Sequence, residues 1–214
     1  ALLAEIAKLD DTVTIQIDDP IFVKGVEPKV LSLIKPCYDA LCSVANNINI
    51  IVTTYFEHSN EATKVLVHTP IWGIGLDFVH GKNNTESLDL IANSGKKLIA
   101  GVVDGRNIWK NNITQTAELL EKISKSVAED NIIVSTSCSL LHTPFTLKYE
   151  EKMDTEIKNC LSYAVEKIGE ISLVSKVFFN GIDLLNTDET AAYMENIEAN
   201  KTRKNSTRIH NEEI

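Results

Sequence analysis

Five short runs rich in valine and isoleucine recur along the chain, and segments with helical periodicity separate them. Runs this dense in branched apolar residues are typical of strands that are buried on both faces. Strands that alternate with helices over short connections predict a parallel sheet with helices packed outside it. The predicted strands are 12–20, 49–57, 74–81, 98–103 and 131–138.

Each predicted strand ends in polar side chains, which is the layout expected at the site face of a (β/α)8 barrel. A doubly wound sheet is the competing architecture, but the sequence contains no G-x-G-x-x-G or phosphate-binding loop. A closed barrel of this type needs eight strands. We therefore expect an α/β fold of the TIM-barrel type, of which the chain holds about the last five β/α units.

The stretch Gly101–Trp109 changes abruptly from a buried strand to the polar residues Asp104, Arg106 and Asn107. Gly105 indicates a sharp turn at a point where a side chain would interfere. One interpretation is a site in which Asp104, Arg106 and His142 hold a small anion. The alternative, which we favour, is a buried Asp104–Arg106 pair that locks neighbouring loops.

Two further groups of polar residues could carry chemistry. Asp18 and Asp19 could form an acid/base pair, but adjacent strand residues point to opposite faces, so one of them serves another purpose. A metal site would need ligands from the two strand ends that hold Asp77 with His80 and Cys138 with His142. No pair at ligand spacing anchors such a site, so hydrogen-bonded structural roles are the simpler interpretation.

Composition limits the partners and the location. The net charge of −9 argues against nucleic acid and anionic membranes as general partners. No apolar run approaches the roughly 18 residues of a membrane-spanning helix. The four cysteines suggest no disulfide framework, which fits a reducing, cytoplasmic compartment. We expect residues 1–185 to form the barrel part and residues 186–214, which are mostly polar, to form a helical or extended linker.

Several stretches together resemble one family. Gln16–Pro20, Thr53–Glu57, Gly75–Val79, Gly101–Trp109 and Ser137–Pro144 occur in the order and spacing of cobalamin-independent methionine synthase. The resemblance covers nearly the whole chain. More specifically, the chain resembles the second half of that enzyme's N-terminal barrel. DGRNIW and SCSLLH-x-P are its most specific motifs.

The resemblance implies a methyltransferase of methionine biosynthesis. In the family, a methyl group passes from 5-methyltetrahydropteroyl-polyglutamate to homocysteine, and a zinc ion activates the thiol. The zinc ligands, the catalytic histidine and the homocysteine site belong to the C-terminal barrel, which this chain lacks. The chain would thus be a scaffold fragment that is inactive alone and packs on its own C-terminal barrel.

The two barrels of the family are similar to each other, which allows a residue-by-residue comparison. Thr54 and Phe56 stand where the catalytic barrel has a His-x-Cys pair of ligands. Asp77 and Cys138 fall near the positions of its other two ligands, and Arg106 falls where it has the catalytic histidine. Phenylalanine cannot bind metal and arginine is too firmly protonated to shuttle protons. We therefore expect no metal and no catalytic residue here.

The residues left as substrate-binding candidates lie at the barrel mouth. They are Asp18, Asp77, Asp104, Arg106, Asn107 and His142. The second hypothesis, from another functional class, is a free-standing barrel-like module that binds a small anionic ligand.

Overall fold

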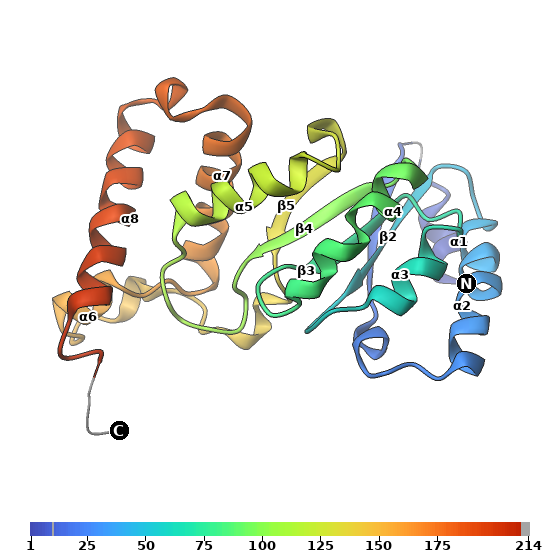
Figure 1. Cartoon of the computed structure of the whole chain (residues 1–214), viewed down its shortest axis with the longest axis horizontal. Helices are drawn as coiled ribbons and strands as arrows, with labels where there is room; N and C mark the ends of the chain where they lie inside the picture. Colours follow the sequence, from blue (N-terminus) through green and yellow to red (C-terminus); the bar gives the residue numbers. More distant parts are fainter. Residues whose placement is uncertain (10, 211–214) are drawn as a thin grey trace. The chain divides into compact units, whose positions relative to one another are not determined.

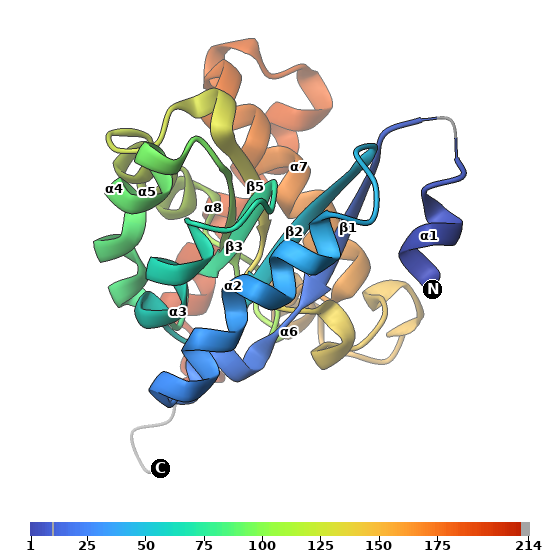
Figure 2. The same cartoon turned by 90° about the vertical axis from the view of Figure 1, so that its right-hand side faces the viewer.

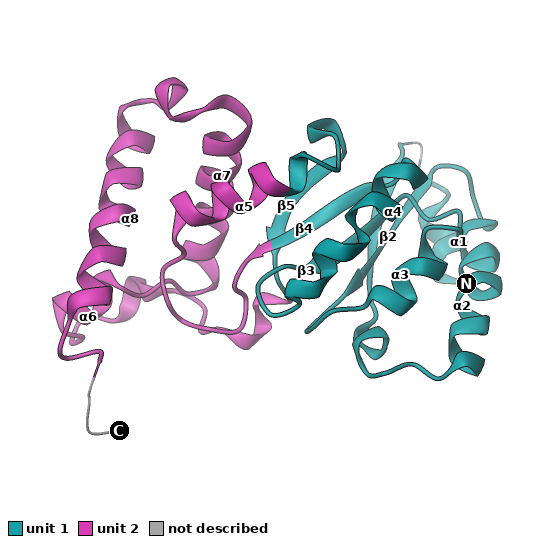
Figure 3. Ribbon diagram, in the orientation of Figure 1, with its two compact units in different colours: residues 1–101, 123–137 teal, residues 102–122, 138–214 magenta. Residues whose placement is uncertain are grey.

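The computed structural model describes residues 1–9 and 11–210. The chain divides into two compact units (Figure 3). The first comprises residues 1–101 and 123–137, and the second comprises residues 102–122 and 138–214. Within the described ranges, no helix has the length and apolar character needed to cross a membrane.

A single five-stranded sheet dominates the first unit, which contains all of it except Val102 and Val103. Its strands lie side by side in the order in which they occur along the chain, and the first four are paired in parallel. The strands are β1 (Val13–Asp18), β2 (Ile48–Thr54), β3 (Gly73–Asp77), β4 (Lys97–Val103) and β5 (Ile132–Thr136).

The strand order distinguishes the two candidate architectures. A doubly wound sheet reverses its strand order at a switch point, whereas a barrel adds each strand beside the previous one. The sheet has no reversal, and β1 and β5 are its two edges. The expected fold class is therefore confirmed: the chain holds five β/α units of a TIM-type barrel.

Burial within the sheet explains the apolar runs. Val52, Ile74 and Leu98 are paired across β2, β3 and β4 and are fully buried. Strands covered on both faces lose alternation in their sequence, as β2 to β4 do. The edge strand β1 instead alternates between partly buried and exposed residues.

Helices α2, α3 and α4 of the first unit lie on one face of the sheet (Figures 1 and 2). Helix α2 contains Pro36 and continues through it. The helical elements of this unit are α1 (Leu2–Ile6), η1 (Pro20–Val23), α2 (Pro28–Cys42), α3 (Asn60–Leu66), η2 (Lys82–Ser87), α4 (Leu88–Ser94) and η3 (Glu129–Asn131).

The second unit is mainly helical. Helices α7 and α8 run antiparallel and are joined by residues 181–186 (Figure 1). Helix α8 begins with a capping box formed by Asn186 with Glu189, and at the start of α7 the Glu166 carboxylate accepts the Tyr163 N–H. The elements are α5 (Ile113–Ser124), whose last two residues belong to the first unit, η4 (Leu140–His142), η5 (Leu147–Tyr149), α6 (Thr155–Asn159), α7 (Ala164–Asn180), η6 (Ile182–Leu184) and α8 (Thr187–Asn205).

Four predicted strands end earlier than expected, at Asp18, Thr54, Asp77 and Thr136. The third strand was expected to reach Gly81 but ends at Asp77, because its Oδ1 accepts the backbone N–H groups of Val79 and His80 and turns the chain. Between residues 150 and 180 the chain forms the two helices α6 and α7, and Asp154 caps α6 by accepting the N–H groups of Glu156 and Ile157.

The segment 186–214 was expected to be a linker. Over its described part, it forms helix α8 and buries Tyr193, Asn196 and Ala199. A helix that buries these side chains contributes to the packing of the second unit. The division at residue 185, and a further barrel beyond this helix, stay predictions.

Candidate functional site

Asp18 ends β1 and is bonded by its neighbours in the first unit. Its Oδ1 accepts hydrogen bonds from Thr53 Oγ1 at 2.6 Å and from Gln16 Nε2 at 2.7 Å. Burial raises the pKa of this carboxyl, but hydrogen bonds from Thr53, Tyr55 and Gln16 outweigh burial and lower it below the usual value. Asp18 is thus an ionised acceptor, whereas Asp19 faces Tyr38 of α2 at 3.4 Å and its pKa is raised by burial.

A buried network joins the ends of β2 and β3. The hydroxyls of Thr54 and Ser59 lie 2.6 Å apart, and the Ser59 N–H donates to Asn84 Oδ1 at 2.9 Å. Asn84 Nδ2 donates to the backbone oxygen of Asp77 at 2.8 Å. Thr54 and Asp77 therefore belong to one connected cluster, and Thr54 is a structural hydrogen-bonding residue in it.

Asp77 is the most enclosed carboxylate of this cluster, with 0% of its surface exposed. Its Oδ1 accepts two backbone N–H groups, and its Oδ2 is buried with no hydrogen-bond partner. Burial raises the pKa of Asp77, and the two backbone hydrogen bonds oppose that rise. The arrangement turns the chain after β3, and a buried oxygen without a donor destabilises it.

In the second unit, the loop between β4 and α5 (residues 104–112, the β4–α5 loop) folds around Asp104. Its two carboxylate oxygens accept the Arg106 N–H at 2.8 Å and Asn107 Nδ2 at 2.5 Å. Asn107 Oδ1 in turn accepts the Trp109 N–H at 3.0 Å. Asp104 and Asn107 therefore shape the turn.

Arg106 lies in the same turn, but its side chain is exposed to solvent. The favoured interpretation was a buried Asp104–Arg106 pair. Its burial was wrong, because Arg106 is exposed and Asp104 is only partly buried. The pairing of the two charges stays a prediction. His142, which follows β5, is also exposed.

Gly105 is required by close packing. A Cβ at this position would lie 2.7 Å from the backbone oxygen of Cys138 and 3.1 Å from its Sγ. Real Cβ atoms do not approach a backbone oxygen this closely, so the loop can lie against the chain after β5 only with glycine here. The predicted interference with a side chain is confirmed, and Cys138 is its buried partner, 2% exposed.

Helix α8 holds the end of the β4–α5 loop through amide side chains. Asn196 Nδ2 and Asn200 Nδ2 both donate to the backbone oxygen of Asn111, at 2.8 and 3.0 Å. Asn196 Oδ1 accepts the N–H of Ile113, the first residue of α5, at 3.2 Å. Asn196 therefore satisfies both a carbonyl and an N–H of the loop backbone.

Helix α7 holds the same loop through two buried charged residues. Lys167, with 0% exposure, donates from Nζ to the Trp109 backbone oxygen at 3.0 Å. Glu170, with 8% exposure, accepts the Asn111 N–H at Oε1 with a distance of 2.9 Å. Burial lowers the pKa of Lys167 and raises that of Glu170, while the opposite charge of each partner counteracts both shifts.

Arg203 completes this support from α8. Its Nη1 donates to the Lys110 backbone oxygen at 3.0 Å, and its guanidinium lies 5.7 Å from the centre of the Trp109 ring. The backbone N–H of the same residue, Lys110, donates to the Cys160 carbonyl at 2.9 Å. Helices α7 and α8 thus hold the loop backbone from residue 109 to residue 113.

The sequence interpretation missed this support. Residues 196–208 were considered polar and linker-like, although their asparagines and Arg203 satisfy the backbone of a loop about 90 residues earlier. Two signals were available: Asn196 and Asn200 share one helix face, and Lys167 and Glu170 lie in an otherwise apolar helical pattern.

Comparison with known proteins identifies the family. Residues 1–128 match the family described as "Cobalamin-independent synthase, N-terminal domain". The chain belongs to this family. The resemblance carried by the DGRNIW and SCSLLH-x-P motifs is therefore confirmed.

Curated relatives that carry the name 5-methyltetrahydropteroyltriglutamate–homocysteine methyltransferase match over most of the chain. The protein of Desulforamulus reducens is 51% identical over 86% of this chain and 24% of its own length. Those of Kali turgidum and Klebsiella pneumoniae are 39% and 34% identical over 94% and 100% of this chain, in each case 26% of their own length. The chain thus spans about a quarter of the relatives' length.

A solved structure shows the same fold. It is described as a B12-independent methionine synthase from Shewanella sp. W3-18-1 in complex with selenomethionine. Its TM-score is 0.61 at 19% identity, over 85% of this chain and 52% of that one. The match supports the barrel-type arrangement of this family member.

Two of the four positions compared with zinc ligands of the family offer no free ligand atom. Thr54 Oγ1 is engaged with Ser59 and Gly75, and Phe56 has no ligand atom. Within residues 1–9 and 11–210, no three histidine, cysteine or acidic side chains gather in a way that could hold a metal ion.

Proposed function

We propose that this chain is a scaffold part of an enzyme that transfers a methyl group from 5-methyltetrahydropteroyltriglutamate to homocysteine. The observation that carries the proposal is the 51% identity, over 86% of the chain, to a curated relative with that activity in its name. The reaction yields methionine, and its two substrates would be the small-molecule partners of the whole protein.

The chain itself would not catalyse the reaction. A zinc site needs a complete set of ligands, and of the compared positions Thr54, Phe56, Asp77 and Cys138, the one at Phe56 has no ligand atom. Arg106 stands where the catalytic barrel of the family would have its titratable histidine. Zinc and the homocysteine site would then be supplied by a C-terminal barrel, on which this chain would pack.

The role proposed for the chain is to present its barrel mouth to that second barrel. Candidates for substrate contact there are Asp18, Asp77, Asp104, Asn107 and the exposed Arg106 and His142. The alternative, an independent module in which Asp104, Arg106 and His142 hold a small anion, stays a prediction. The four cysteines form no disulfide within the described residues, which supports a cytoplasmic location.

A chimera tests the proposal. The matching quarter of the Desulforamulus reducens relative is replaced by this chain, and methionine formation from the two substrates is measured. We expect activity within about tenfold of the parent enzyme, since a scaffold replacement leaves the reacting groups in place. A chimera that folds and binds zinc, but forms no methionine, would refute the scaffold role.

Metal analysis of the chain tests the second half of the proposal. Dialysis against excess zinc followed by elemental analysis should leave no stoichiometric zinc, because the compared positions offer no complete ligand set. One tightly held zinc ion per chain would show that these residues do form a metal site.

A further inference from the structure

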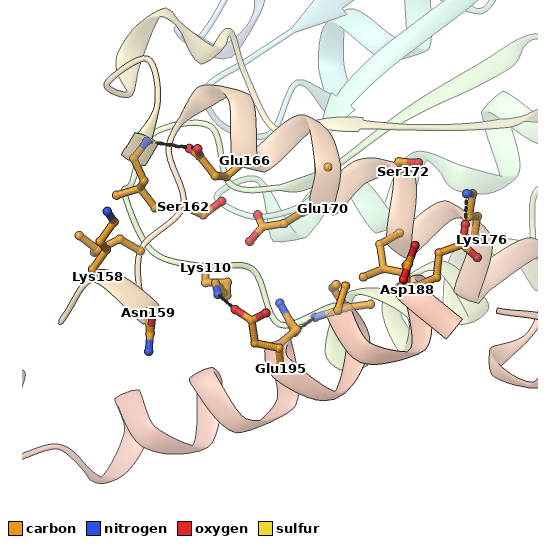
Figure 4. A pocket seen from close by; sticks show the side chains of 18 residues that line it. Lys110, Lys158, Asn159, Ser162, Glu166, Glu170, Ser172, Lys176, Asp188 and Glu195 are labelled. Carbon is orange, nitrogen blue, oxygen red and sulfur yellow. Dashed lines mark hydrogen bonds and ion pairs between the residues drawn. The ribbon is translucent and has the colours of Figure 1, made fainter. Parts of the chain in front are cut away.

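The second unit contains a cavity of about 590 Å³ between α7, α8 and the segment before α7 (Figure 4). Its volume is in the range of small-molecule sites. Apolar side chains form much of its wall, among them Ile113, Leu147, Leu161 and Leu173. None of the sequence motifs and none of the candidate residues of the barrel mouth belongs to it.

Two buried polar groups face this cavity without a hydrogen-bond partner. They are Glu170 Oε2, in a side chain with 8% exposure, and Ser162 Oγ, in a residue with 0% exposure. Figure 4 shows both side chains directed toward the same space. The Ser162 hydroxyl lies near enough to help lower the pKa of Glu170, but the two do not have the geometry of a hydrogen bond.

A buried carboxylate oxygen and a hydroxyl that both lack a partner are costly, and a ligand that donates to both would remove that cost. Glu170 Oε1 is already used by the Asn111 N–H. The nearby Lys167 donates to the Trp109 carbonyl. The atom left for a ligand is therefore Oε2, an acceptor that suits an N–H donor.

The charge around the cavity also selects the ligand. Five acidic and three lysine side chains line it, which leaves an excess of two negative charges. Each lysine is engaged within the chain: Lys110 with Glu195 at 3.2 Å, Lys176 with Glu189, and Lys158 with the Glu150 backbone oxygen at 3.0 Å. An anionic ligand would meet repulsion here, and a cation would be attracted.

We propose that this cavity binds a small organic amine with an apolar body. The ammonium group donates to Glu170 Oε2 and Ser162 Oγ, and the apolar part contacts Leu147, Leu161 and Leu173. The site is independent of the methyl-transfer proposal, because its residues are not used there for chemistry.

Calorimetry with n-hexylammonium, hexanol and hexanoate as matched probes tests this site. Loss of a hydrogen bond to a charged partner corresponds to about a 10- to 100-fold weaker dissociation constant. We therefore expect saturable binding of hexylammonium, at least about tenfold weaker binding of hexanol, and no binding of hexanoate.

Three variants assign the binding to the cavity. Glu170→Gln keeps an oxygen for the Asn111 N–H and should weaken hexylammonium binding by at least about tenfold. Glu195→Gln, at the 70% exposed rim, should change it by no more than about fivefold. Gly169→Leu should block the amine and the alcohol alike, because a side chain at this cavity-lining residue begins in open space.

Circular dichroism confirms that each variant is folded before it is titrated. Equal affinity for hexanol and hexylammonium, preference for hexanoate, or unchanged binding by Glu170→Gln would overturn the proposal. The absence of any saturable heat up to the solubility limit of the amine would also overturn it.

Discussion

Replacing Lys167 by methionine removes one buried charge from α7 while leaving a side chain of similar length. Lys167 is fully buried, and its ammonium donates to the Trp109 carbonyl. The change leaves that carbonyl without this donor and leaves the buried Glu170 without its nearby cation. Breaking a buried charge interaction from one side costs about 3–5 kcal/mol, and we expect a loss of this size in the free energy of unfolding.

A double-mutant cycle separates the charge interaction from lost packing. Glu170→Gln retains a carbonyl oxygen for the Asn111 N–H, so its own cost is dominated by leaving Lys167 uncompensated. In the double variant, neither charge is buried. We expect it to be more stable than the sum of the two single effects implies, with a coupling energy of about 1–3 kcal/mol.

Urea unfolding followed by tryptophan fluorescence measures these free energies. The chain has two tryptophans, Trp72 and Trp109, and a Trp72→Phe background leaves the one whose carbonyl Lys167 binds. The slope of free energy against urea must be equal among the variants for the comparison to hold. Strictly additive losses, with no coupling beyond about 0.5 kcal/mol, would refute the interpretation that the two charges support each other.

Three further changes test other parts of the structure. Gly105→Ala should lower stability by about 1–3 kcal/mol in thermal or urea unfolding, because its Cβ would meet Cys138; Gly169→Ala, which meets no atom within 4 Å, is the matched control and should be neutral or slightly stabilising. Arg106→Ala should change the unfolding free energy by no more than about 0.5 kcal/mol, since the side chain is exposed; a loss above about 2 kcal/mol would restore the bracing role expected from sequence. Burial raises the pKa of Asp77 above its ordinary value of 3.8, so the stability that this carboxyl contributes is present below pH 3.8 and is lost as the pH rises through the folded-state pKa. Asp77→Asn should therefore gain stability relative to the parent as the pH rises above 3.8. A stability difference that does not change with pH would contradict this.

Much of the sheet followed from the sequence. Dense valine and isoleucine runs identified all five strands, since strands covered on both faces must be apolar on both. Their ends were less well predicted: β3 stops at Asp77 because a side chain competes for the backbone N–H groups that follow. Gly105 was also interpreted correctly as a point of steric conflict, although Cys138, the partner in that contact, could not be named.

The partners of the polar side chains were harder to predict. Asp104 and Arg106 are close in sequence and opposite in charge, which favoured a buried pair, yet the Arg106 side chain is exposed. The Asp104 carboxylate also accepts the Arg106 backbone N–H and Asn107 Nδ2, which are donors of its own loop. The exposure of Arg106 depends on how other segments pack around the turn, and the neighbouring sequence carries no information about those segments.

The sequence by itself determined the alternation of strands and helices, the family, and the need for glycine at position 105. The tertiary structure alone decided that strands follow one another without reversal and that α7 and α8 hold the β4–α5 loop. The physical reason is separation along the chain. Glu170 and Asn196 satisfy backbone groups of Asn111 from 59 and 85 residues away, and only the folded chain brings these atoms together.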